Sequence, residues 1–143
     1  MTAPGRDAPD TPDTPSSFLA FDFGTRRVGV ASGNSLTGAA SPLGTVAAIG
    51  EPRFAAIGRY IDDWQPGALV VGVPFHPDGA EHDNTARARR FARQLGGRFK
   101  LPVHEVDERY STTEALQMHA SDVDAASAAI ILEQFLASLD ARR

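Results

Sequence analysis

The chain has 143 residues, of which 42% are hydrophobic and 22% charged, a composition typical of a single globular domain with a core of its own. The absence of cysteine excludes disulfides and thiolate metal sites, and no apolar run is long enough to span a bilayer. The formal net charge of -4 provides no overall attraction to nucleic acid, and a cytoplasmic protein without a membrane partner is expected.

Residues 1–17 contain four prolines and no large apolar residue after Met1, which predicts a disordered tail ahead of one folded domain at residues 18–143. Within that domain, short apolar runs predict strands, and apolar side chains three or four residues apart predict helices. In chain order, the sequence predicts strands at 18–23, 28–32 and 40–46, a helix at 51–65, a strand at 68–74, a helix at 85–100, a strand at 102–108, a helix that begins at a capping box of Ser111 and Glu114, and a last helix at 122–139.

The order of these elements predicts an α/β domain, in which a mixed sheet carries helices on its faces. Three acids lie at the ends of elements: Asp22 in the first strand, Glu108 after the last strand with Asp107 beside it, and Asp124 in the first turn of the last helix. If the first and last strands are neighbours and the last helix packs over them, these carboxylates converge, and their mutual repulsion favours protonation or a bound cation. Oxygen ligands favour Mg²⁺ or Mn²⁺, and two such ions can activate a water and stabilise the leaving oxygen of a phosphodiester.

Each acid also has a simpler explanation. Asp22 could pair with Arg26 or Arg27 across the hairpin turn, although an exposed ion pair is worth little and does not account for an acid inside an apolar run. Asp107 could be an ordinary exposed residue at a strand end. Asp124 could serve only to complement the dipole of a helix N-terminus, which explains that residue at least as well when it is taken alone.

Residues 85–100 form a basic segment, TARARRFARQLGGRFK, with six Lys or Arg residues and no acid. Most charge runs are solvated helix faces, but a single sign of charge over four turns favours a surface that binds phosphates. The predicted contacts to a nucleic-acid backbone are Arg87, Arg90 and Arg93 in this segment, Thr25 with Arg26 or Arg27 in the hairpin turn, and Ser111, which could equally be only a helix cap.

Six blocks occur in order along the chain: LAFDFGTRRVGVASGN, TGAASPL, VVGVPFHPDG, TARARRFA, VDERYSTTEA and VDAASAAIILEQFL. Together they resemble the YqgF/RuvX family, RNase H-like proteins related to Holliday junction resolvases, over nearly all of residues 18–139. The resemblance implies an RNase H-like fold, a five-stranded mixed sheet with helices on both faces. It also implies a cytoplasmic, divalent-metal-dependent nuclease that processes the 5′ end of pre-16S rRNA or cleaves branched or single-stranded DNA.

The resemblance also implies roles for individual residues. The three acids of the family fall on Asp22, on Glu108 next to Asp107, and on Asp124, the same positions that the element ends indicate. These acids are therefore expected to hold Mg²⁺ or Mn²⁺ ions, with two ions favoured. A junction resolvase would in addition need a homodimer to cut two strands symmetrically.

Two other functions compete with the nuclease. DFGTRRVG also resembles the phosphate-binding hairpin of sugar kinases and actin-like ATPases, but those enzymes close two domains on a nucleotide and this chain has one. A non-catalytic nucleic-acid-binding module, acting in transcription or ribosome assembly, would share the basic segment. Such a module would have no reason to keep Asp22 in an apolar strand, so the sequence favours a phosphodiesterase.

Overall fold

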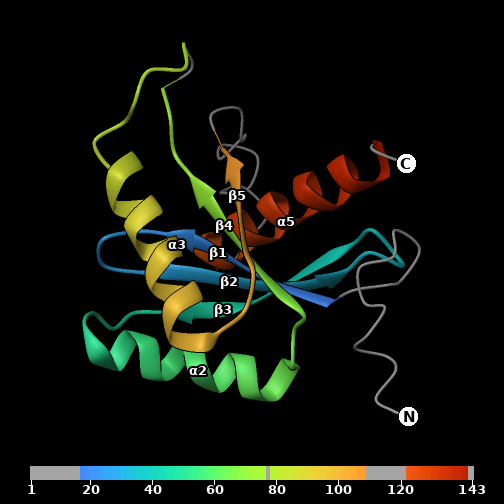
Figure 1. Cartoon of the computed structure of the whole chain (residues 1–143), viewed down its shortest axis with the longest axis horizontal. Coiled ribbons are helices and arrows are strands. Elements are labelled where there is room, and N and C mark those ends of the chain that lie inside the picture. Colours follow the sequence, from blue (N-terminus) through green and yellow to red (C-terminus); the bar gives the residue numbers. More distant parts are fainter. Residues whose placement is uncertain (1–16, 77, 109–121, 142–143) are drawn as a thin grey trace.

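The computed structural model describes residues 17–76, 78–108 and 122–141. Within these ranges the chain forms a five-stranded sheet that carries helices on both faces (Figure 1). The elements are β1 (Ser17–Phe23), β2 (Val28–Asn34), β3 (Ala40–Val46), α2 (Glu51–Trp64), β4 (Ala68–Val73), α3 (Thr85–Phe99), β5 (Val103–Asp107) and α5 (Val123–Ala141).

The predicted α/β architecture is confirmed, and the bounds of the described elements agree with the prediction within two residues. β1 begins at Ser17, one residue before the predicted strand and inside the segment assigned to the tail. The rest of that tail, residues 1–16, and the predicted capping box at Ser111 and Glu114 lie outside the described residues. None of the described helices is long and apolar enough to cross a membrane.

The strands lie in the order β3-β2-β1-β4-β5, so β1 is central. It pairs with β2 in antiparallel and with β4 in parallel orientation, while β5 runs parallel to β4 at the edge. The first and last strands are not neighbours, so the condition set for the acids to converge is not met in that form, because β4 lies between the two strands. β1, β4 and β5 are nevertheless parallel, so their carboxyl ends meet at one edge of the sheet (Figure 1).

The side chains of β1 alternate between the two faces of the sheet. Leu19 and Phe21 belong to the core beneath α2 and α3, whereas Phe18 and Ala20 belong to the core beneath α5. Asp22 continues the second series and therefore faces α5. The alternation of a buried strand thus places the single acid of β1 on the face that the last helix covers.

Candidate active site

Asp22 lies between two glycines on the neighbouring strands. In the sheet register it is opposite Gly29 of β2 and Gly72 of β4. Neither glycine has a side chain, so the surface around Asp22 is open on both sides. Residues of α5 approach both glycines, Glu108 approaches Gly72 as well, and the acids Asp124 and Glu108 are among these neighbours.

Gly29 admits the first turn of α5. A Cβ atom at this position would overlap the backbone oxygen of Asp124, so only glycine can be accommodated. Asp122 directly precedes this helix. Its Oδ1 accepts hydrogen bonds from the backbone N–H of Ala125 at 3.0 Å and from the Thr45 hydroxyl at 2.6 Å. Asp122 is therefore the cap of α5. Asp124, two positions further on, is left to interact with the edge of the sheet.

Gly72 provides the room for Glu108. The backbone N–H of Glu108 donates to the carbonyl of Val73 at 3.1 Å, which holds the residue beside the end of β4. Its Oε2 lies 3.0 Å from the position that a Cβ atom on Gly72 would take. The Glu108 carboxyl thus reaches across β4 to hydrogen-bond Asp22. Glycine at this position leaves room both for Glu108 and for the Ile131 side chain of α5, which lies nearer still.

The carboxyl groups influence one another strongly. Burial and the charge of Asp124 raise the pKa of Asp22 from 3.8 to about 6, although hydrogen bonds from Glu108 and Ser127 favour its ionised form. Burial, together with the neighbouring charges of Asp22 and Asp107 and the hydrogen bond to Asp22, raises the pKa of Glu108 to about 8. Because the two carboxyl groups interact, they titrate as a pair, and the form in which both are ionised is disfavoured.

Ser127 is a component of the site that does not stand out in the sequence. It is buried in α5 and hydrogen-bonds Asp22. Ser127 follows Asp124 by three residues, so both lie on the same side of the helix. A buried hydroxyl one turn after a candidate ligand is the signal that could have identified it.

The hairpin turn between β1 and β2 provides a further contact. The Nε of Arg27 lies 2.9 Å from Oδ2 of Asp124, so Arg27 pairs with that acid and not with Asp22 as the simpler explanation held. Arg53 of α2 holds the backbone of this turn, and the sequence pattern does not reveal that role. Arg53 is buried and donates to the backbone oxygens of Thr25 at 3.1 Å and Ala48 at 2.8 Å.

The donor chemistry of Asp22, Glu108 and Asp124 fits a hard divalent cation. All ligand atoms are carboxylate oxygens, and a cation would replace the proton that the crowded Asp22–Glu108 pair takes up. Among the residues that the structure describes, no three His, Asp or Glu side chains lie close enough together to hold one metal ion. Instead, Asp22 is hydrogen-bonded to Glu108, and Asp124 forms an ion pair with Arg27.

The predicted phosphate contacts are spread along α3. Thr85, at the start of this helix, donates its hydroxyl to the carbonyl of Pro74, so the N-terminal end of α3 lies at the same sheet edge as Asp22. Arg87 and Arg90 are in the first two turns and Arg93 is one turn further along α3, which covers the face of the sheet opposite to the one where Asp22 meets α5. The guanidinium of Arg87 donates a hydrogen bond to the side-chain oxygen of Asn84 at 3.1 Å. The remaining predicted contact, Ser111, lies outside the described residues.

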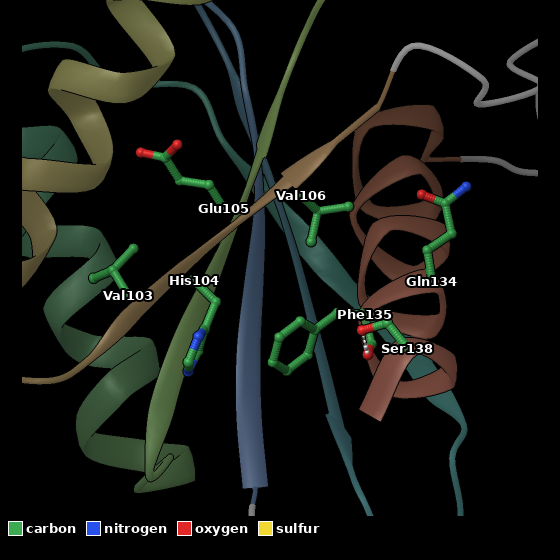
Figure 2. A pocket seen from close by; sticks show the side chains of 7 residues that line it. All are labelled: Val103, His104, Glu105, Val106, Gln134, Phe135 and Ser138. Atoms are coloured by element: carbon green, nitrogen blue, oxygen red, sulfur yellow. Dashed lines mark hydrogen bonds between the residues drawn. The ribbon is translucent and has the colours of Figure 1, made fainter. Parts of the chain in front are cut away.

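A cavity of about 510 Å³ lies between β5 and the C-terminal half of α5. The ring of His104 packs against the ring of Phe135, with 4.9 Å between the ring centroids. The Ser138 hydroxyl donates a hydrogen bond to the backbone carbonyl of Phe135 at 2.7 Å (Figure 2). The lining includes neither Asp22 nor Asp124. The acids therefore do not line this cavity.

Comparisons with known proteins identify the family. The model of the RuvX family, described as "Holliday junction resolvase", matches residues 16–138. A relative from Albidiferax ferrireducens is 61% identical over 137 residues, covering 96% of this chain and 88% of its own length. A relative from a Polaromonas species is 66% identical over 123 residues, covering 86% and 89% respectively. Both carry the name "Putative pre-16S rRNA nuclease".

Solved structures show the same fold. RuvC of Thermus thermophilus superposes with a TM-score of 0.57 at 13% identity, over 87% of this chain and 96% of RuvC. The same protein in complex with a Holliday junction substrate gives a TM-score of 0.55 at 14% identity, over 86% and 94%. The family model and the two close relatives cover almost the whole described domain, and the chain therefore belongs to the RuvX family of Holliday junction resolvase-like nucleases.

Proposed function

We propose that this chain is a divalent-metal-dependent phosphodiesterase and that its substrate is pre-16S rRNA. The observation that carries the proposal is the position of Asp22 on the central strand, where it is hydrogen-bonded to Glu108 and close enough to Asp124 for the two charges to interact. The substrate is inferred from the names of the two close relatives. Precursor rRNA is processed where ribosomes assemble, so the proposal includes a cytoplasmic location.

In this proposal Asp22, Glu108 and Asp124 hold two Mg²⁺ or Mn²⁺ ions, and Asp107 assists them. Bound divalent cations supply activation of water and charge neutralisation at the phosphodiester. The protein holds the carboxyl groups in place. The two glycines beside Asp22 leave room for the other acids, and Ser127 orients the Asp22 carboxylate. These contacts come from the folded sheet and α5.

The substrate backbone is proposed to follow the basic residues at the same sheet edge. Cationic side chains that neutralise phosphates give binding that is independent of sequence and sensitive to salt. The proposed contacts are Thr25, Arg26 and Arg27 in the hairpin turn, Arg87, Arg90 and Arg93 in α3, and Ser111.

The proposal is tested with the Asp22→Asn variant, which keeps the shape of the side chain but removes the charge. Mn²⁺-dependent cleavage of a precursor rRNA should fall by more than the roughly 10–100-fold loss typical of residues that only support a metal ligand. Binding of the RNA should be unchanged or tighter, because one negative charge near the phosphates is lost. Asp62→Asn, an exposed acid in α2, is the matched control. An Asp22→Asn protein that cleaves as fast as the control would contradict the proposal.

A four-way DNA junction is a second candidate substrate, favoured by the description of the family model. Symmetric cleavage of a junction requires two active sites, so this alternative also predicts a homodimer. The two substrates are separated by offering precursor rRNA, single-stranded DNA, duplex DNA and a four-way junction to the same preparation with Mg²⁺ or Mn²⁺. Sedimentation with and without the junction then tests the dimer.

A further inference from the structure

We propose that Arg27 is a positioning residue that responds to the cation: it competes with a divalent cation for the Asp124 carboxylate and, once displaced, is free to contact a substrate phosphate. The inference rests on the proposed function, since it concerns the same acids. Its basis is the ion pair between Arg27 Nε and Asp124 Oδ2, at 2.9 Å. A guanidinium there neutralises the carboxylate in place of a metal ion.

The ion pair explains how the acids are arranged in the described chain. Asp22 and Glu108 are hydrogen-bonded to each other, while Asp124 is engaged by Arg27, and no three acids of the described chain come close enough to hold one ion. A cation that binds Oδ2 of Asp124 has to displace the guanidinium, and a cation that binds the other oxygen is still repelled by the positive charge of Arg27. Arg27 and the cation therefore compete for this carboxylate.

The exchange is energetically easy. The side chain of Arg27 is 64% exposed and that of Asp124 is 30% exposed, so water screens their attraction, and such pairs contribute little to stability. The movement can be confined to the side chain, because Arg53 holds the backbone of the turn through the carbonyl of Thr25. Once released, the guanidinium remains at the sheet edge, where it can form charge-assisted hydrogen bonds to a phosphate.

The first test measures binding of Mn²⁺ alone to the full chain by titration calorimetry. Arg27→Ala removes the competitor and should tighten Mn²⁺ binding by about two- to fivefold, the range expected from the weak attraction of an exposed ion pair. Arg26→Ala is the matched control: it removes the same charge from the same turn, and Arg26 forms no ion pair with a described residue. Arg26→Ala should therefore change the affinity less. Arg27→Lys, which keeps a cation at this position, should restore binding toward that of the natural chain.

The second test measures binding of a single-stranded oligonucleotide in EDTA and in Ca²⁺, another hard cation that prefers oxygen ligands. The natural chain should bind more tightly with Ca²⁺, because Arg27 is then released toward the phosphates, and Arg27→Ala should lose most of this enhancement. A merely structural role for Arg27 would not produce tighter Mn²⁺ binding together with a lost enhancement.

The outcomes separate this inference from the proposed function. If Arg27→Ala binds Mn²⁺ no more tightly than Arg26→Ala, while Asp22→Asn still abolishes cleavage, the competition by Arg27 is disproved and the nuclease proposal is retained. If the natural chain binds no Mn²⁺ and Asp22→Asn cleaves normally, the proposed function itself fails.

Discussion

Asp22 could be recognised from the sequence because a charged residue inside an apolar strand needs a partner. Its partners could not be identified in the same way. Glu108 reaches it across β4, and Ser127 reaches it from α5, so both contacts depend on how distant elements pack. A partial signal was present in Gly72, because a glycine inside a buried strand often marks the close approach of another group.

Ser127 provides a prediction at the level of a single hydrogen bond. Its hydroxyl stabilises the ionised form of Asp22, so Ser127→Ala should raise the pKa of that carboxyl further. The acid limb of the pH–rate profile for Mn²⁺-dependent cleavage should consequently move to higher pH. Ser138→Ala is a suitable control, since Ser138 is in the same helix but donates to the carbonyl of Phe135. Equal profiles for the two variants would show that Ser127 does not orient the carboxylate.

At the level of elements, hydrophobic periodicity predicted α3 well. Ala88, Phe91 and Leu95 are buried against the sheet, as their helical spacing indicated. The periodicity does not tell which arginines on the other side are available to a ligand. Arg89 pairs with Glu105, and Arg98 pairs with Glu51, and both acids are far away in the sequence.

Strand order was harder to predict for the same reason. Periodicity identifies a strand and the two faces of that strand, but it does not specify which strand lies beside which. The segment after β4 returns through α3 and adds β5 outside β4, not beside β1. Asp22 and Glu108 nevertheless lie at one edge, since the carboxyl ends of the parallel strands β1, β4 and β5 share an edge whatever their order.

The salt dependence of nucleic-acid binding tests which arginines of α3 contact phosphates. Arg90 and Arg93 are exposed and form no ion pair with a described residue, so they are available to phosphates. Replacing both with alanine should lower the slope of log K against log salt by about 0.7 for each lost contact to a single strand. The matched control replaces Arg89 and Arg98, which removes the same charge from the same helix but from residues already paired. If both double variants change the slope equally, net charge and not position governs binding.

For the whole molecule, the crowded carboxyl groups oppose folding as the pH rises. The pKa of Asp22 is raised from 3.8 to about 6 and that of Glu108 from 4.5 to about 8, so the folded chain holds more protons than the unfolded chain between these values. The resulting stabilisation is fully present below about pH 4 and is lost as the pH rises through 6 and 8. Because a tenfold change in acidity is equivalent to about 1.4 kcal/mol, the raised pKa of Asp22 alone corresponds to a loss of about 3 kcal/mol.

A divalent cation should reverse this trend, because it binds the ionised carboxylates and stabilises only the folded chain. In EDTA, the free energy of unfolding measured in urea should fall between pH 5 and pH 8.5, and Mn²⁺ should recover it at pH 8.5 but have little effect at pH 5, where protons occupy the acids. The acidic surface contributes a pH dependence of its own, so the informative quantity is the difference from Asp22→Asn. That variant should show a shallower fall in EDTA and a smaller gain from Mn²⁺, whereas Asp62→Asn should follow the natural chain. If the fall in EDTA is as steep in Asp22→Asn as in the natural chain, the repulsion resides in other acids and the site around Asp22 is not the one that a cation stabilises.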